Sequence, residues 1–106
     1  RRVVVYSPIG IINTGTIASE YSLSQNYPNP FNPVTQIKFS VAKGSKIEIV
    51  VYDILGNIVA KPVNENINQG EYRVEFDGTG LSSGTYFYSL IVNGEKKTTK
   101  KMLLLK

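Results

Sequence analysis

The carboxylates are the side chains best suited to catalysis in this sequence. Five of them fall within or beside segments of alternating hydrophobicity: Glu48, Asp53, Glu71, Glu75 and Asp77. A general acid and a general base must reach one substrate, and no pair here has a spacing that forces two carboxylates together. The absence of histidine and cysteine excludes Ser-His and Cys-His nucleophiles, thiolate zinc sites and histidine metal sites. We therefore predict that the protein is not an enzyme and has no cofactor.

A second candidate site is the stretch Asp77-Gly78-Thr79-Gly80. Its oxygens could contact calcium, but that ion takes roughly six to eight oxygen ligands, which the stretch cannot supply. A phosphate-binding loop would need a lysine and a helix after the glycines, and neither follows. We interpret the stretch as an Asx turn, in which the aspartate accepts a hydrogen bond from a nearby backbone amide.

Aromatic rings are the remaining feature that could bind a ligand, because exposed rings stack on sugars. Tyr52 and Phe87 could form such a platform on the surface of a β-sheet. Packing between two sheets is the alternative, and it is the interpretation that we favour for both residues.

The formal net charge of +4 comes mainly from the two ends of the chain, starting with Arg1 and Arg2. Five lysines fall within the last eleven residues: Lys96, Lys97, Lys100, Lys101 and Lys106. Lysines on an edge strand discourage pairing with other strands. A nucleic-acid surface would instead mix arginines with aromatic rings. We expect no nucleic-acid partner and no small-molecule substrate.

From residue 34 onward the sequence alternates apolar and polar side chains, which is typical of strands with one buried face. Ile37, Phe39 and Val41, for example, share one face of their segment, and no helical period competes. Turn-forming residues separate the segments at short, regular intervals. We predict an all-β protein, an immunoglobulin-like antiparallel β-sandwich of about seven strands within residues 20–106.

Two turns with glycines predict how neighbouring strands pair. Asn93-Gly94 suits a two-residue type I′ hairpin, which needs positive φ at both positions, so the segments 85–92 and 95–104 should pair. Gly56 suits a loop closed by a glycine bulge that leads into a strand at 57–61.

Ser83-Gly84-Thr85-Tyr86 resembles the tyrosine corner of immunoglobulin-like folds, in which the tyrosine hydroxyl bonds back to a nearby backbone group. Tyr88 would then stand where antibody domains keep a disulfide cysteine. Two ordinary core tyrosines are the alternative, and the sequence leaves both interpretations open.

The segment from Asn26 to Pro33, NYPNPFNP, can form neither a helix nor a regular strand. Its three prolines fix φ, remove backbone donors and push the preceding residues into extended conformations. They are Pro28, Pro30 and Pro33. Tyr27 and Phe31 offer apolar anchors to the sandwich. We predict a rigid corner with both rings buried.

Several segments, taken in order, resemble the C-terminal sorting domain of the type IX secretion system. They are residues 27–33, 37–39, 51–53, Leu55-Gly56, Gly70, 76–78, 81–86 and 100–106. Each segment alone is weak evidence, whereas the ordered set is specific. Three positions depart from the usual pattern: Ala42 replaces a frequent proline, Phe76 replaces a frequent tryptophan, and Lys61-Pro62 interrupts the strand after Gly56.

The resemblance implies an address label at the C-terminus of a large exported protein of the Bacteroidetes and related bacteria. The cargo would pass through the periplasm, an outer-membrane translocon would recognise the folded domain, and the cargo would reach the outer-membrane surface or be secreted. A sortase-like peptidase would cut before Tyr21 and attach the cargo to anionic lipopolysaccharide. Residues 1–19 would be the end of the preceding cargo domain plus a linker, and residues 20–106 the sorting domain.

The resemblance also implies roles for single residues. Translocon recognition would use the terminal strand, the Asp77-Gly78 turn, Gly84 and Tyr86, with Met102 and Leu104 holding that strand in its sheet. The residues of the terminal strand are Lys100, Lys101, Met102, Leu103, Leu104, Leu105 and Lys106. The fold-setting residues would be Tyr27, Pro28, Pro30, Phe31, Pro33, Gly56 and Gly70. The alternative function is an immunoglobulin-like accessory module that binds carbohydrate or mediates adhesion.

Overall fold

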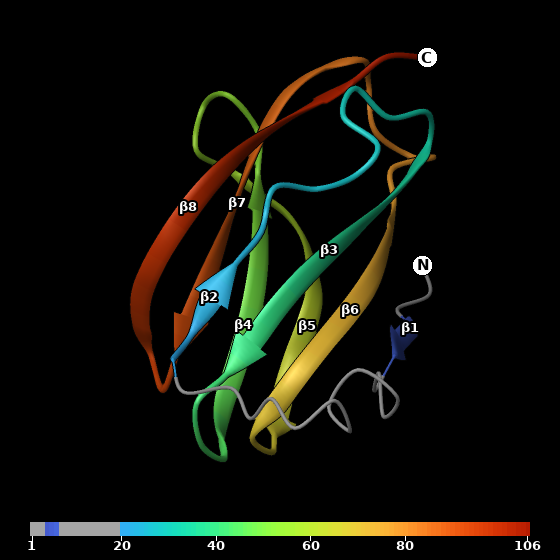
Figure 1. The fold of residues 1–106 in the computed structure, drawn as a ribbon. Helices are drawn as coiled ribbons and strands as arrows, with labels where there is room; N and C mark the ends of the chain where they lie inside the picture. Colours follow the sequence, from blue (N-terminus) through green and yellow to red (C-terminus); the bar gives the residue numbers. More distant parts are fainter. Residues whose placement is uncertain (1–3, 7–19) are drawn as a thin grey trace.

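Two four-stranded antiparallel sheets face each other in the computed structural model, which describes residues 4–6 and 20–106 (Figure 1). The first sheet has the order β1 (Val4–Tyr6), β6 (Gly70–Asp77), β3 (Val34–Val41) and β2 (Ser22–Leu23). The second has the order β5 (Ile58–Ile67), β4 (Ser45–Tyr52), β7 (Gly84–Val92) and β8 (Glu95–Leu104). The predicted sandwich is confirmed, and β2 to β8 are the seven strands expected. No helix in the described part of the chain is long and apolar enough to cross a membrane.

Inward-pointing side chains from both sheets form one hydrophobic core. The alternation predicted for β3 is confirmed, since Ile37, Phe39 and Val41 are all buried. The outward face of the second sheet differs from the expectation, because Val50 and Ser89 point away from the core and are nevertheless only 2% and 0% exposed. They are register partners in the two central strands of that sheet, and the Ser89 hydroxyl is hydrogen-bonded to the Thr99 hydroxyl of β8 at 2.7 Å.

Strand β5 continues through Pro62, so the expectations of a short strand at 57–61 and of an interruption at Lys61-Pro62 were wrong. Val63 pairs with Ile49 and Ala60 with Val51, which leaves two residues of β5 opposite one of β4. This bulge takes up the proline. Because β5 is an edge strand, the missing proline N–H breaks no bond to a second neighbour.

The turns follow the sequence prediction. Asn93 and Gly94 have φ values of 50° and 86°, as the type I′ hairpin between β7 and β8 requires. Gly56, with φ of 90°, closes the loop from β4 to β5. In that loop the Asp53 carboxylate accepts hydrogen bonds from the backbone amides of Asn57 and Leu55, both at 2.9 Å. The bond from Asn57 is the main reason why the pKa of Asp53 lies below its ordinary value.

Two tyrosines of β7 tie the fold together through their hydroxyl groups. Tyr86 donates to the carbonyl of Ser82 at 2.7 Å, which confirms the tyrosine corner. Tyr88 is fully buried; its hydroxyl donates to the carbonyl of Ser24 and accepts from the amide of Asn26, both at 2.7 Å. Burial raises the pKa of Tyr88 to about 12. A hydrogen-bonded tyrosine thus joins the two layers where a disulfide would join them in antibody domains.

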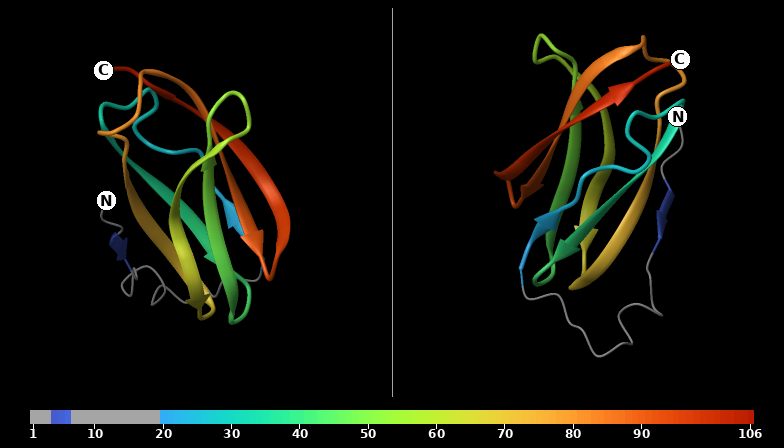
Figure 2. Two further views of the ribbon diagram at one scale, coloured as in Figure 1. Left: turned by 180° about the vertical axis from the view of Figure 1, so that it is seen from behind. Right: turned by 45° about the horizontal axis from the view of Figure 1, so that its top comes forward.

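Strand β1 pairs with β6 at one edge of the first sheet, with Val5 opposite Val74. At the other side of the sandwich, β8 is the outermost strand of the second sheet, as both views of Figure 2 show. The assignment of residues 1–19 to a preceding domain and linker stays a prediction, and residues 1–3 and 7–19 lie outside the described part of the chain.

Candidate functional site

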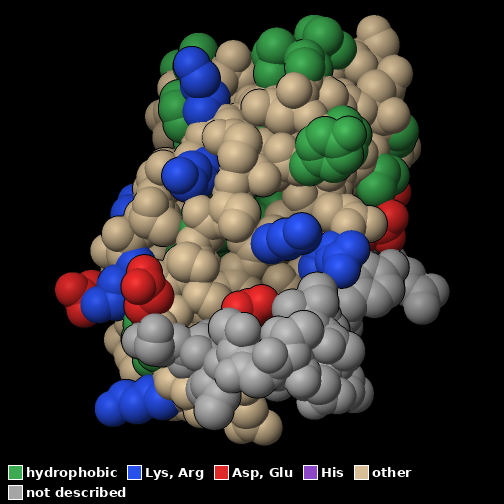
Figure 3. All heavy atoms as spheres, in the orientation of Figure 1, with side chains coloured by type: hydrophobic (Ala, Val, Ile, Leu, Met, Phe, Trp, Pro, Cys, Tyr) green, Lys and Arg blue, Asp and Glu red, His purple; other side chains and the backbone are tan. Residues whose placement is uncertain are grey.

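The structure brings most of the predicted recognition and fold-setting residues to one end of the sandwich. The loop 27–33, the turn 77–80 and the chain end 103–106 meet there, and we call these three segments the end cap (Figure 1). Figure 3 shows hydrophobic side chains gathered at this end, which is drawn uppermost. The end cap is therefore the candidate recognition site.

Backbone hydrogen bonds join the proline-rich loop to the end of β8. The Phe31 amide donates to the carbonyl of Leu103 at 2.9 Å, and the Leu105 amide donates to the carbonyl of Phe31 at 3.0 Å. Between these bonds, Phe31 and Leu104 form a parallel bridge. The Leu103 amide donates to the Asn29 side-chain oxygen at 3.0 Å. Residues more than seventy positions apart are thereby held in a fixed register.

The Phe31 side chain is the packing centre of the end cap. It is 2% exposed, as predicted, and its ring meets the edge of the Phe76 ring at a centroid distance of 6.1 Å. The turn approaches closely, since the Gly78 amide donates to the carbonyl of Pro33 at 2.8 Å. A Cβ atom at Gly78 would lie 3.3 Å from side-chain atoms of both Phe31 and Leu104. A side chain at this position would therefore be tightly packed, and Phe31 or Leu104 would have to shift by a few tenths of an ångström to admit it.

The prediction that Tyr27 is a buried anchor was wrong, because the side chain is 81% exposed. Its backbone is nevertheless fixed by two hydrogen bonds of 3.0 Å with Gln36. Asn26, rather than Tyr27, is buried at this point of the loop. Its side-chain amide donates to the carbonyl of Pro28 and to the hydroxyl of Thr35, both at 3.0 Å. The sequence indicated that Asn26 could bond to neighbouring backbone, but not that it is buried, because its partners Thr35 and Tyr88 lie nine and 62 positions away.

The Tyr27 ring borders a hollow of about 360 Å³ on the outer face of the first sheet. The other lining residues are Ser24, Gln25, Gln36, Lys38 and Arg73.

The terminal strand contains both buried residues, which belong to the core, and exposed residues, which a partner could contact. Met102 and Leu104 are fully buried, which confirms their expected role in the sheet, whereas Lys101 and Lys106 are exposed and Leu105 is 50% exposed. Two other predicted recognition residues also belong to the fold: Gly84 pairs with Leu104 in the β7–β8 ladder, and Tyr86 is buried opposite Met102.

The chain end is fastened to the segment between β6 and β7. The Lys106 amide donates to the Ser83 hydroxyl at 2.9 Å, and its ammonium group donates to the carbonyl of Thr79 at 2.6 Å. The Asx turn that begins this segment is confirmed, since the Thr79 amide donates to the Asp77 carboxylate at 2.9 Å. The terminal lysine is thus oriented by two contacts with neighbouring loops.

The remaining candidate carboxylates do not converge. In the described part of the chain, no three Asp, Glu, His or Cys side chains gather in a way that could hold a metal ion. The preferred interpretation of Tyr52 and Phe87 was wrong, because these register partners lie on the outer face of the second sheet rather than between the sheets. The Lys96 ammonium lies 4.9 Å from the centre of the Tyr52 ring, where a stacked sugar would have to sit.

Comparison with known proteins decides between the candidate functions. Residues 25–105 match the family model described as the secretion system C-terminal sorting domain. The chain belongs to this family. The sorting domain is the C-terminal signal for type IX secretion, and the alternative of a carbohydrate-binding accessory module is not favoured. It is attached to a cargo that is secreted or displayed on the outer-membrane surface, and the secretion machinery recognises it. The family is not known to be enzymatic.

Among solved structures, the sorting domain resembles the Pseudomonas fluorescens alkylpurine DNA glycosylase AlkC bound to DNA containing an abasic site analog. The TM-score is 0.55 at 15% identity, and the match covers 92% of this chain and 33% of that one. At such identity the likeness shows the fold alone. No curated protein matches the chain.

Proposed function

We propose that residues 20–106 act as one folded address unit whose end cap is read by the outer-membrane type IX translocon. The observation that carries this proposal is the bridge between the proline-rich loop and the terminal strand. Phe31 and Leu104 are both buried and form the bridge between the two segments. The exposed residues that follow, Leu105 and Lys106, therefore have a defined position only in the folded domain. Recognition of this end would therefore report that the domain has folded.

An exposed apolar side chain supports a protein partner at this end. Leu105 belongs to the end cap and is 50% exposed. An exposed apolar side chain beside a fixed backbone segment gives a protein partner a contact point. The Asp77-Gly78 turn, in contact with both partners of the bridge, completes the proposed recognition surface.

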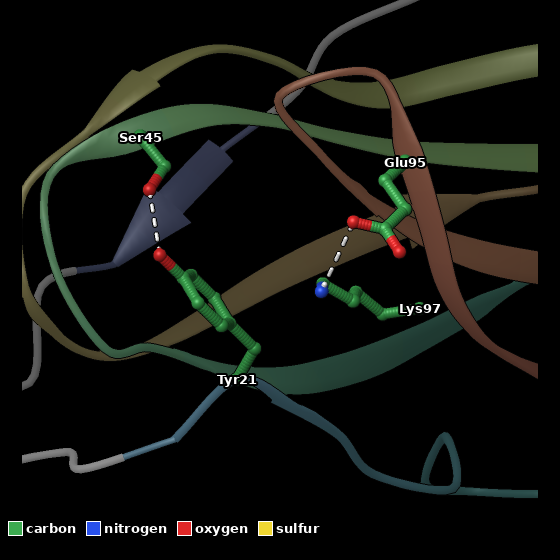
Figure 4. Close-up of polar contacts among 4 residues, drawn as sticks. All are labelled: Tyr21, Ser45, Glu95 and Lys97. Carbon is green, nitrogen blue, oxygen red and sulfur yellow. Dashed lines mark hydrogen bonds and ion pairs between the residues drawn. The ribbon is translucent and has the colours of Figure 1, made fainter.

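The same proposal gives the remaining parts of the chain their roles. Residues 1–19 would link the sorting domain to its cargo, which crosses the periplasm before it reaches the surface or the medium. A sortase-like peptidase would cut this linker before Tyr21. The Tyr21 hydroxyl lies 2.8 Å from the Ser45 hydroxyl of β4, so a cut before this residue leaves this contact with the domain (Figure 4). The domain itself would bind no cofactor and catalyse no step.

Deleting residues 100–106 is expected to leave a cargo trapped in the periplasm of a type IX host. The deletion removes Met102 and Leu104 from the core together with the exposed end. Cargo in the periplasmic fraction and cargo accessible to antibody on intact cells are the two quantities to measure. Normal surface display of the truncated protein would refute the proposal.

A matched variant separates the surface from the fold. Replacing Leu105 and Lys106 together by serine keeps every core side chain, so the free energy of unfolding should change by no more than about 0.5–1 kcal/mol. We expect surface display to fall about tenfold, the equivalent of roughly 1.4 kcal/mol of lost binding free energy. Unchanged display would show that the translocon reads another part of the domain.

A further inference from the structure

The edge of β8 is only partly covered. β8 is the last strand of the second sheet and pairs on one side with β7 (Figures 1 and 2). On its other side, residues 25–31 bond to its C-terminal part: the Gln25 side chain donates to the carbonyl of Lys101 at 2.6 Å, and further bonds reach Leu103 and Leu105. Hydrogen bonding along this side of β8 therefore ends at Lys101; β2 also lies near β8, but it pairs only with β3.

The backbone groups at the uncovered part can be identified from the register. In an antiparallel pair, residues alternate between bonding to their neighbour strand and pointing away from it. Leu103 and Leu105 bond outward, so Lys101 and Thr99 also point outward, whereas Thr98, Lys100 and Met102 bond to β7; the bulge in the β7–β8 ladder lies before Thr98. Among the described residues, nothing bonds to the Lys101 amide or to the amide and carbonyl of Thr99. These three groups form a free strand edge.

The strand is rich in lysine beside this edge, and two of the lysines already have a partner, since Lys96 lies over the Tyr52 ring and Lys97 lies beside Glu95. The lysines of β8 in this part are Lys96, Lys97, Lys100 and Lys101. A carboxylate lies near one of them, since Glu95 is 3.3 Å from the Lys97 ammonium group (Figure 4). Basic side chains recur along the side of the molecule where β8 runs (Figure 3), while the one arginine of the described residues, Arg73, belongs to β6 in the other sheet.

We propose that the free edge of β8 at Thr98–Lys101 accepts an extended, acidic segment of a partner protein as an added β-strand. Main-chain bonds to Thr99 and Lys101 supply the attachment, as in other cases of strand addition. The lysines determine which strand can bind. A second copy of β8 would place lysine opposite lysine, which is unfavourable, whereas an acidic strand would be attracted. The edge thus disfavours pairing with β8 of another copy of the domain and favours pairing with an acidic strand.

This inference does not depend on how the end cap is read. A peptide of about eight residues that alternates glutamate and valine is a suitable probe, with lysine–valine and serine–valine peptides as controls. Each peptide is titrated into the 106-residue chain, and amide hydrogen exchange is followed by NMR. With the acidic peptide, exchange of the Thr99 and Lys101 amides is expected to slow by about tenfold or more, because they gain partners. The Lys100 and Met102 amides, already bonded to β7, should change little.

Substitutions at one position provide the matched control. Thr99→Pro removes the outward N–H without removing a bond to β7, and it should weaken binding of the acidic peptide by about tenfold or more. Thr99→Ala keeps the N–H and removes only the hydroxyl that contacts Ser89, so it should bind like the unmodified chain. If the proline variant does not fold, the exchange data on the unmodified chain still decide.

Three results would overturn the proposal. The first is an acidic peptide that binds without protecting the Thr99 and Lys101 amides. The second is equally tight binding of the serine–valine peptide. The third is binding of the acidic peptide that Thr99→Pro leaves unchanged in a folded variant, because the lysines would then attract the peptide by charge alone.

Discussion

Replacing Phe31 by alanine is expected to destabilise the sorting domain by about 3–5 kcal/mol, the usual cost of removing a buried phenylalanine side chain. The ring is almost fully buried and packs against Phe76, and it lies within van der Waals reach of the Gly78 turn. Its loss would leave a cavity where the loop, the turn and the terminal strand meet. Urea unfolding followed by circular dichroism measures the change in free energy.

The same motif contains its own control. Tyr27→Ala removes an aromatic side chain four residues earlier, but that side chain is mostly exposed, and the hydrogen bonds of Tyr27 to Gln36 come from its backbone and are kept. We expect its free energy of unfolding to change by about 0.5 kcal/mol or less. Equal destabilisation by the two substitutions would contradict the conclusion that the motif is anchored by Phe31.

Replacing Tyr88 by phenylalanine is expected to cost about 1–3 kcal/mol at neutral pH, although the ring is kept. The substitution leaves the amide of Asn26 and the carbonyl of Ser24 without their hydroxyl partner. Asn26 is itself buried, so solvent cannot fully replace the lost bond. Thermal and urea unfolding of the two proteins under identical conditions give the difference.

Tyr88 also makes the stability of the domain depend on alkaline pH. Burial raises its pKa in the folded state to about 12, above the ordinary value of 10.0 that applies when the chain is unfolded. The folded state favours the neutral hydroxyl of Tyr88. The stability that this preference contributes is fully present below pH 10 and is lost as pH rises from 10 towards 12. The loss amounts to about 2–3 kcal/mol for a shift of this size. The pKa of Tyr72 is also raised by burial and acts in the same direction.

The phenylalanine variant tests this pH dependence directly. Because it lacks the titrating hydroxyl, its free energy of unfolding should fall less steeply between pH 10 and 12 than that of the unmodified domain. The difference between the two proteins should therefore shrink as pH rises. Parallel curves over this range would show that the Tyr88 hydroxyl does not titrate in the way that its burial predicts.

The strands and their buried faces could be predicted because both depend on local pattern. Alternation in the segment of Ile37, Phe39 and Val41 required one buried face, and Asn93-Gly94 required a tight hairpin. Pro62 shows the limit of such rules, since a proline ends a central strand but is accepted in an edge strand with a bulge. Position in the sheet is a property of the whole fold, which local pattern does not contain.

The aromatic residues outside the regular core were harder to predict for a related reason. Alternation assigned Tyr52 to the face opposite the core residues of its strand, yet packing between sheets was preferred on residue type alone. In the proline-rich loop, the buried hydrogen bonds of Asn26 decide that Tyr27 points outward and Phe31 inward. These bonds reach Tyr88 and Thr35, so only the folded structure reveals them.

The end cap itself combines segments from opposite ends of the domain. The sequence resemblance indicated that the loop 27–33 and the terminal strand both matter, but not that they contact each other. Their bridge at Phe31 and Leu104 spans more than seventy residues, and no local signal encodes it. Seen in the structure, the two ends of the family pattern form one packed unit, with the lysine-rich edge of β8 continuing beside it.

Export of a foreign cargo would show whether residues 20–106 carry the secretion signal by themselves. Residues 20–106 are fused to a fluorescent protein that carries an inner-membrane export signal, and surface fluorescence is compared in type IX hosts with and without the translocon. We expect cargo on the surface or in the medium of the first host and in the periplasm of the second. Equal distribution in both hosts, together with glycan binding by the fusion, would contradict this expectation.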